Sequence, residues 1–248
     1  VYPAKGYYPV RIGNHEFKGD SKHIFFWRIV NKGGFEPNFF KMLDRCLTKD
    51  SVYCDIGAWI GPTAMYASRL CKTVHAFEPD GIAYNYLLKN IENNGIDNII
   101  THNVAIATEN GFIKMASHGG KPGDSMSSMV NIDRYKKSFR AKAIKWKTFL
   151  EIHDPGRIDF IKMDIEGGEF EIIPSMKRYL QKNKPMLHLS LHPAYLPEEE
   201  KKGKVENILS ELDFYDQVLN DKLKKAEPSE IIGESSAKKD FLSFLFIP

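Results

Sequence analysis

Short runs of β-branched and aromatic residues alternate along this chain with stretches whose apolar residues recur at helical spacing. Four such runs occupy residues 51–56 (SVYCDI), 73–77 (TVHAF), 99–105 and 157–163 (RIDFIKM). Strands that alternate with helices pair in parallel, because each helix carries the chain back to the start of the next strand. The pattern therefore predicts an α/β domain built on a mostly parallel sheet.

The remaining segments extend the same pattern towards both ends of the chain. Apolar positions within 36–49 lie on one face of a helix, and residues 185–191 (PMLHLSL) read as a further apolar strand. A helix is expected from Phe170 onward, and Pro174 should kink or restart it because proline lacks the N–H that a helix interior needs. Two final strands are predicted at 214–219 and 241–247.

Composition and charge exclude several classes of protein. The chain has 248 residues, of which 42% are hydrophobic and 27% charged, as in ordinary globular proteins. A formal net charge of +3 disfavours nonspecific wrapping of duplex nucleic acid, because proteins that do so are normally more basic. The apolar run at 241–248 is too short to span a membrane, and the first residues have no signal-peptide pattern. Three cysteines without a CxxC pair favour a reducing compartment, so a cytoplasmic protein is expected.

No segment after Ile96 resembles a linker between independent domains. We therefore expect an N-terminal extension with a cap helix over residues 1–50, and a single domain over 51–248. Residues 106–145 interrupt the alternation with an insertion rich in Gly, Ser and Lys, and loops of this length are often functional. Its basic residues could clamp an anionic group, although such runs are more often solvated surface. They are Lys121, Arg134, Lys136, Lys137, Arg140 and Lys142.

A glycine-containing turn, DIGAWIG at residues 55–61, joins the first predicted strand to its helix. Glycine lets the backbone turn tightly and approach a ligand closely, and the following helix points its N–H groups at that ligand. In open α/β sheets a nucleotide binds at such a point. By itself the spacing of Gly57 and Gly61 is weak evidence, because ordinary strand-to-helix turns also contain glycine.

An acidic residue, Glu78, ends the second predicted strand, 23 residues after Asp55. A carboxylate at this offset accepts hydrogen bonds from the ribose hydroxyls of an adenosine. The dinucleotide fingerprint needs a glycine where this chain has Trp59, and the charge of Asp55 would repel a pyrophosphate. The same charge suits the cationic end of S-adenosylmethionine (SAM). The residues therefore favour SAM over a dinucleotide.

The segments DIGAWIG, AFEPD, NVAIA and IDFIKMDIEGGE together resemble the FkbM family of SAM-dependent methyltransferases. The resemblance runs from about Ser51 to His192, and its most specific part is the K-x-D-x-E-G-x-E signature that begins at Lys162. It implies the class I methyltransferase fold, a Rossmann-like, seven-stranded, mostly parallel sheet with a C-terminal antiparallel hairpin and helices on both faces. The family mostly methylates hydroxyl oxygens of sugars and other natural products. Many members carry asparagine where this chain has Trp59.

The resemblance also implies which residues hold the cofactor. The loop at 55–61 would line the methionine end of SAM, Glu78 would hold the ribose, and residues 103–105 would lie beside the adenine. Asn103 is explained equally well as a turn residue that caps its own backbone. The expected cofactor-binding residues are Asp55, Gly57, Ala58, Trp59, Gly61, Glu78, Pro79, Asn103, Val104 and Ala105.

Three side chains are expected at the rim where the parallel strands end. Asp164 and Glu166 follow the strand at 157–163, and His192 follows the strand at 185–191. Methyl transfer to a hydroxyl needs in-line positioning and removal of the hydroxyl proton, and a carboxylate or a histidine performs the second task. We expect Asp164, Glu166 and His192 to be the catalytic residues. Their ordinary explanations are a helix cap for Glu166 and a strand-end residue for His192.

The same three side chains would also suit a divalent ion, as in a metal-dependent small-molecule O-methyltransferase. The chain has neither a histidine pair at i, i+4 nor a D-x-D-x-D-G loop, so the sequence assigns no metal site.

The expected function is therefore SAM-dependent O-methylation of a saccharide, glycan or glycosylated natural product, with a small-molecule or glycan acceptor as partner. A nucleic-acid methyltransferase is an alternative. Enzymes that methylate base amino groups usually carry an N/D-P-P-Y/F turn where this chain has DIEG, so this alternative is disfavoured. A SAM-binding module without activity is a third possibility, and the retained Asp164, Glu166 and His192 argue mildly against it.

Overall fold

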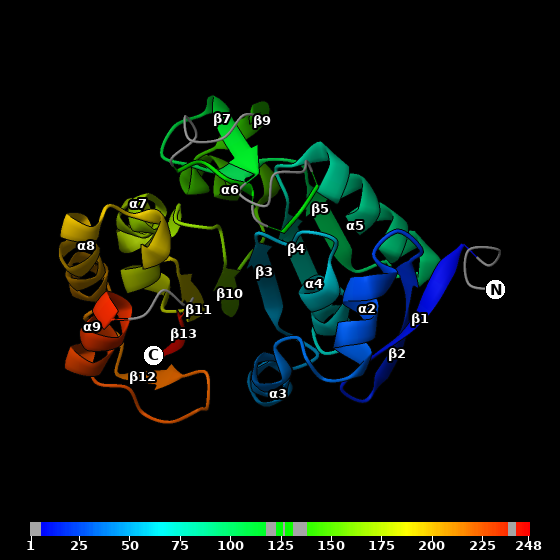
Figure 1. Ribbon diagram of the computed structural model, residues 1–248, viewed down its shortest axis with the longest axis horizontal. Coiled ribbons are helices and arrows are strands. Elements are labelled where there is room, and N and C mark those ends of the chain that lie inside the picture. Colours follow the sequence, from blue (N-terminus) through cyan, green and yellow to red (C-terminus); the bar gives the residue numbers. More distant parts are fainter. Residues whose placement is uncertain (1–5, 118–122, 126, 131–137, 238–241) are drawn as a thin grey trace.

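A computed structural model describes residues 6–117, 123–125, 127–130, 138–237 and 242–248 of the chain (Figure 1). Its central sheet has seven strands. They are β3 (Val52–Ile56), β4 (Thr73–Phe77), β5 (Ile99–His102), β10 (Phe160–Met163), β11 (Met186–Leu191), β12 (Gln217–Asn220) and β13 (Leu242–Ile247). Their order across the sheet is β12-β13-β11-β10-β3-β4-β5. The strands from β11 to β5 are parallel, whereas β13 is antiparallel to both of its neighbours.

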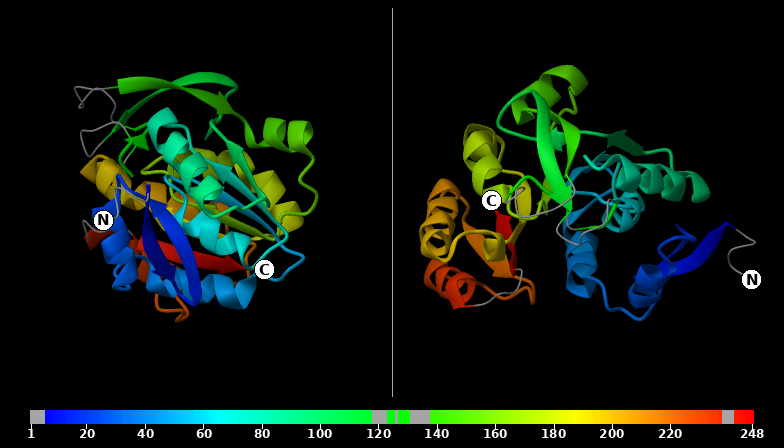
Figure 2. Two further views of the ribbon diagram at one scale, coloured as in Figure 1. Left: turned by 90° about the vertical axis from the view of Figure 1, so that its right-hand side faces the viewer. Right: turned by 45° about the horizontal axis from the view of Figure 1, so that its top comes forward.

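Helices cover both faces of this sheet (Figures 1 and 2). They are α2 (Ile24–Asn31), α3 (Pro37–Cys46), α4 (Pro62–Ser68), α5 (Gly81–Asn93), α6 (Trp146–His153), α7 (Glu169–Asn183), α8 (Glu198–Glu211) and α9 (Pro228–Ala237), with a short 3-10 turn η2 (Pro193–Tyr195). The expected α/β class with a mixed sheet is confirmed. No helix in the described ranges is both long enough and apolar enough to cross a membrane.

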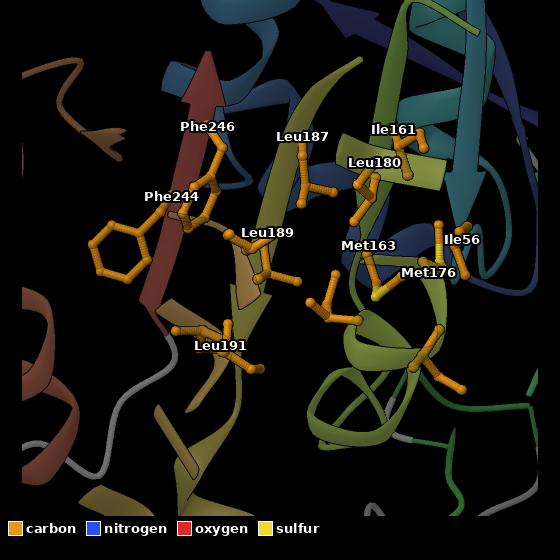
Figure 3. Close-up of a cluster of buried hydrophobic side chains, with 14 of the residues drawn as sticks. Ile56, Ile161, Met163, Met176, Leu180, Leu187, Leu189, Leu191, Phe244 and Phe246 are labelled. Atoms are coloured by element: carbon orange, nitrogen blue, oxygen red, sulfur yellow. The ribbon is translucent and has the colours of Figure 1, made fainter. Parts of the chain in front are cut away.

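The strands send alternate side chains into two separate cores, as the two-residue period of a strand requires. On β3, Tyr53 packs into the core beneath α3 and α4, whereas Cys54 and Ile56 pack into the core beneath α6 and α7. Figure 3 shows part of the second core, in which side chains of β3, β10, β11 and β13 lie in one cluster with side chains of α7. Its labelled side chains on β11, β13 and α7 are Leu187, Leu189, Leu191, Phe244, Phe246, Met176 and Leu180. A sheet buried on both faces explains why these strands read as continuous apolar runs.

Pro174 does not restart the helix that contains it. Helix α7 runs without interruption from Glu169 to Asn183, so the expected restart is wrong, whereas the alternative expectation, a kink, stays a prediction. A proline here removes one backbone hydrogen bond, the one to the carbonyl of Phe170. The buried face of the helix, which includes Ile173 and Met176, packs against the central sheet and offsets that loss.

The first 50 residues hold more regular structure than the expected cap helix. A hairpin of β1 (Tyr7–Ile12) and β2 (His15–Asp20) precedes α2 and α3. Its last residue, Asp20, is fully buried and accepts hydrogen bonds from the Trp27 indole and the Asn90 amide. The backbone N–H of Asp20 donates in turn to Oδ1 of Asn90, at 2.7 Å. These contacts fasten the N-terminal segment to α5.

The insertion at 106–145 forms a second, smaller sheet. Its strands are β6 (Ala105–Ile106), β7 (Gly111–Ser117), β8 (Ser127–Ser128) and β9 (Ser138–Ile144), in the order β6-β9-β7-β8. Strands β7 and β9 are antiparallel and stand to one side of the central sheet (Figures 1 and 2). The predicted strand at 99–105 is therefore divided, because β5 stays in the central sheet whereas β6 pairs with β9.

Candidate active site

The turn between β3 and α4 lies against the end of β10. The N–H groups of Gly57 and Ala58 both donate to the carbonyl of Phe77, at 3.1 and 2.9 Å, which ties the turn to β4. Gly57 has a φ of 89°. A Cβ atom added to it would lie 1.9 Å from the backbone oxygen of Asp164, so only glycine fits at this position.

We expect Gly57→Ala to lower the free energy of unfolding by at least about 2 kcal/mol, because it combines an unfavourable φ with a collision against backbone. Gly81→Ala is a matched control. No atom lies within 4 Å of the added Cβ there, so its effect should stay within about 1 kcal/mol. Urea denaturation of both variants checks the prediction. Equal stabilities would show that the turn relaxes freely.

Glu78 is buried at the end of β4 and holds the turn that follows. Its Oε2 accepts the N–H of Trp59 at 2.9 Å, and its Oε1 accepts the N–H of Asp80 at 2.8 Å. Burial raises the pKa of Glu78 to about 8, although these two N–H groups oppose the rise. Each carboxylate oxygen keeps a second lone pair, so ribose hydroxyls find acceptors here.

The raised pKa of Glu78 predicts that binding of S-adenosylhomocysteine (SAH), the demethylated product of SAM, depends on pH. Below about pH 8 the carboxyl is protonated and accepts hydroxyl hydrogen bonds poorly. Affinity should therefore rise as the pH increases from 6 to 8, by up to about tenfold per unit, and then level off. Calorimetric titration at several pH values measures this. Glu78→Gln should flatten the dependence, and an unchanged slope in that variant would assign the titration to another group.

A pocket lies between the turn at residues 55–61, the segment after β10 and the insertion. Most of the expected cofactor residues line it. Phe77, Ile106 and Met115 supply apolar walls. The expected residues that line it are Gly57, Trp59, Glu78, Pro79, Val104, Ala105, Asp164 and Glu166. Apolar walls with a carboxylate at one end suit an adenosine, whose flat base is buried and whose ribose is hydrogen-bonded. The residues present therefore fit SAM.

Four expected cofactor residues lie outside this lining. Ala58 is buried within the turn, and Gly61 begins α4 with a φ of 91°. Asn103 donates hydrogen bonds to the backbone oxygens of Glu78 and Pro79, so it shapes the turn after β4. Both acceptors lie on the turn after β4 and not in the segment around Asn103, so these bonds differ from the expected cap of its own backbone.

Asp55 is the fourth residue outside the lining, and its charge is already balanced. It is fully buried, accepts a hydrogen bond from Thr63 and lies 3.6 Å from Nζ of Lys162. Burial raises the pKa of Asp55, although Lys162 and Thr63 oppose the rise. The Asp55 carboxylate, paired in this way, supports the turn at residues 55–61 from within the protein. The charge of Asp55 is thus used inside the protein and does not by itself favour the cationic end of SAM, whereas the lining of the pocket fits SAM.

The three expected catalytic side chains meet at the ends of β10 and β11. Nε2 of His192 lies 3.4 Å from Oδ1 of Asp164 and 3.7 Å from Oε2 of Glu166. Nδ1 of His192 lies 3.0 Å from Oε1 of Glu169, which also accepts the backbone N–H of His192. Oδ2 of Asp164 lies 3.3 Å from Nζ of Lys162. The cluster is therefore a buried network of alternating charges.

The environment shifts the pKa of each member of this cluster. Burial alone would lower the pKa of His192, but Glu169, Asp164 and Glu166 raise it to about 9. Burial acts to raise the pKa of Asp164, but Lys162 and His192 hold it below its usual value. Burial raises the pKa of Glu166 to about 7. Perturbed groups gathered in a pocket are typical of functional sites.

Sequence reasoning missed several contributors to this site. Glu36 has a φ of 42° and begins α3. Burial raises its pKa to about 7, although Lys162 opposes the rise. No local pattern connects Glu36 with β10, so no sequence signal could have found it. Lys162 and Glu169, by contrast, belong to the family signature, but their partners could not be read from it.

The insertion also contributes to the pocket. Its carbonyl at Gly123 accepts the indole N–H of Trp59 at 3.0 Å, and its N–H there donates to Asp80. Asp124, Ser125, Ser127 and Met129 are lining residues. Of the basic residues in the insertion, Arg140 and Lys142 lie on β9, and Arg140 stacks over the Phe112 ring. Lys121, Arg134, Lys136 and Lys137 lie outside the described residues.

Comparisons with known proteins agree with these observations. The model of the methyltransferase FkbM domain matches residues 55–221. The solved FkbM methyltransferase of Methylobacillus flagellatus is 20% identical, with a TM-score of 0.50, over 81% of this chain and 44% of that one. A Streptococcus mutans protein in complex with SAH is 14% identical, with a TM-score of 0.46, over 85% of this chain and 96% of that one.

One curated relative, the uncharacterized protein MJ1452 of Methanocaldococcus jannaschii, is 38% identical over 61 residues, which are 25% of this chain and 24% of that protein. The chain thus spans less than half the length of both the Methylobacillus structure and this relative. The family model nevertheless covers well over half of the chain. The chain therefore belongs to the FkbM methyltransferase family.

Proposed function

We propose that this protein transfers the methyl group of SAM to a hydroxyl of a saccharide, glycan or glycosylated natural product. One observation carries the proposal. The pocket lined by Gly57 and Glu78 is also lined by Asp164 and Glu166, so proton acceptors share a cavity with the expected cofactor residues. An O-methyltransferase needs this combination, because the acceptor must lose a proton where it meets the methyl group.

The residues of the rim are suited to hold and deprotonate a hydroxyl. When bound, SAM supplies an electrophilic methyl group. Asp164 and Glu166 offer carboxylate oxygens to the hydroxyl proton, and Glu169 fixes the ring of His192 so that Nε2 faces both of them. Groups held in place by their neighbours reduce the entropic cost of aligning the acceptor.

The acceptor class is supported by the polar side of the pocket. Asp124, Ser125 and Ser127 of the insertion line it, and short polar side chains form hydrogen bonds with a polyhydroxylated ligand. The family resemblance is compatible with the same class, since it implies methylation of hydroxyl oxygens of sugars and other natural products. The DIEG segment after β10 lacks the N/D-P-P-Y/F turn usual in enzymes that methylate base amino groups.

The test is transfer of labelled methyl from SAM to a panel of mono- and oligosaccharides, with a structured RNA in a parallel reaction. Mass spectrometry then locates the label. The proposal expects the label on a saccharide hydroxyl oxygen and its loss in Glu78→Ala. Label in the RNA and in no saccharide would replace the proposal with the nucleic-acid alternative.

A further inference from the structure

One histidine and two carboxylates converge at the ends of β10 and β11 in a way that suits a metal ion. A donor atom of each of Asp164, Glu166 and His192 lies within 4.8 Å of the other two. A metal ion that binds its ligands at about 2.1 Å places them about 3 to 4 Å apart. The two distances from Nε2 of His192, 3.4 and 3.7 Å, fall in that range. Small side-chain movements would therefore bring the three donor atoms to coordinating distance of one metal ion.

The histidine is oriented as a metal-binding histidine usually is. Its Nδ1 faces Oε1 of Glu169 at 3.0 Å, and the same oxygen accepts its backbone N–H at 2.6 Å. The other oxygen of Glu169 accepts the N–H of Gly167 at 2.9 Å. A carboxylate that holds one ring nitrogen directs the other towards a metal and increases its basicity. Glu169 thus fixes Nε2 on the side where the two carboxylates lie.

Glu166 provides an independent observation. Its side chain is 14% exposed, and its Oε2 atom is buried and makes no well-aligned hydrogen bond in the part of the chain that the structure describes, although the Tyr195 side chain helps to lower the pKa of Glu166. A carboxylate oxygen removed from water without a donor is costly. This oxygen lies 3.7 Å from Nε2 of His192, and a metal ion that displaces the Nε2 proton would satisfy it.

The charges around this point are also unbalanced. Carboxyl groups from Asp164, Glu166 and Glu169 surround it, and Glu36 approaches the same region. Within the described residues, Lys162 is the lysine that pairs with this group, and its Nζ is shared between Asp55 and Asp164. An excess of buried carboxylates favours the uptake of a cation.

We propose that Asp164, Glu166 and His192 bind one divalent transition-metal ion that accepts mixed oxygen and nitrogen ligands, for which Mn²⁺ is the probe. The two carboxylates and one imidazole leave further coordination positions for oxygen atoms of the acceptor. The statement that the acceptor binds to the ion rests on the proposed function. The ion would lower the pKa of a bound hydroxyl, so the three side chains would act on the acceptor through the ion.

Metal binding is tested on the full chain after treatment with EDTA, by following free Mn²⁺ with electron paramagnetic resonance during a titration. The wild-type chain should bind one Mn²⁺ per molecule. Glu166→Gln should weaken binding at least about tenfold, and Glu169→Gln by about 10 to 100-fold, as loss of a partner behind a ligand usually does. Glu171→Gln is the matched control, because Glu171 is exposed in the same first turn of α7 and should leave binding unchanged.

Circular dichroism and thermal unfolding establish that each variant is folded. If one variant fails to fold, the other still tests the site. No stoichiometric binding in the wild-type chain, or equal affinity in Glu166→Gln and Glu171→Gln, would overturn the inference.

Methyl transfer separates this inference from the proposed function. Transfer to a saccharide that is unchanged after removal of metal by EDTA would overturn the role of the ion and leave the proposed function standing. Stoichiometric Mn²⁺ binding by a chain that methylates RNA alone would support the metal site and overturn the proposed acceptor.

Discussion

Replacing Asp164 by asparagine is expected to lower the rate of methyl transfer at least about 100-fold, which is the usual contribution of a positioned acid or base. The amide has the shape of the carboxylate but lacks its charge, so it neither draws a proton from the acceptor nor pairs with His192. Affinity for SAH should change less than about threefold, because the carboxylate of Glu78 and the turn at Gly57 are untouched.

The rate is measured in single-turnover reactions with the saccharide acceptor, and affinity by calorimetry. Asp164 also pairs with Lys162 at 3.3 Å, so thermal unfolding must accompany the rates. Asp213→Asn changes an exposed residue in the same chemical way and should behave as the wild type. A folded Asp164→Asn variant with a normal rate would remove Asp164 from the chemistry.

At about pH 9, where the carboxyl of Glu78 is ionised, its replacement by alanine is expected to weaken SAH binding at least about 30-fold, from the loss of hydrogen bonds to a charged group. Two effects combine. The ribose hydroxyls lose their acceptor, and the N–H groups of Trp59 and Asp80 lose theirs, so the turn that shapes the pocket loosens.

Glu78→Gln keeps one acceptor oxygen and should show an intermediate loss, which separates the charge from the shape of the turn. Glu92→Ala, at an exposed position on α5, serves as the control for a glutamate removed elsewhere. Calorimetric titration with SAH gives all three constants. An affinity for Glu78→Ala equal to that of the wild type would refute the ribose assignment.

Elements with strong local patterns were predicted well. Strand β4 occupies the predicted residues 73–77, because an apolar run between turn residues is decided by near neighbours. Pro174 was misjudged because packing of α7 against the sheet outweighs one missing hydrogen bond. The hairpin β1–β2 and the sheet of the insertion were missed, since pairing between strands is not a local property.

The sequence predicted those residues of the cofactor pocket that follow the ends of consecutive strands. Gly57 and Glu78 follow β3 and β4, and parallel strands bring their carboxyl ends to one edge. The sequence placed Asp55 correctly at the turn after β3, but it predicted the cationic end of SAM as the charge partner of Asp55, whereas the structure pairs Asp55 with Lys162. The register of β10 against β3 sets Lys162 opposite Asp55. Lys162 therefore balances the charge of Asp55 within the protein.

By itself, the sequence determined the α/β class, the glycine turn after β3, the acidic residue after β4 and the family signature after β10. These features arise from backbone sterics and short-range periodicity, which act over a few residues. The tertiary structure alone decided that Glu169 orients His192 and that Glu36 approaches Lys162. It also placed the insertion over the pocket. These contacts depend on strand register and on how the layers pack, so residues distant in the chain acquire their charge partners only on folding.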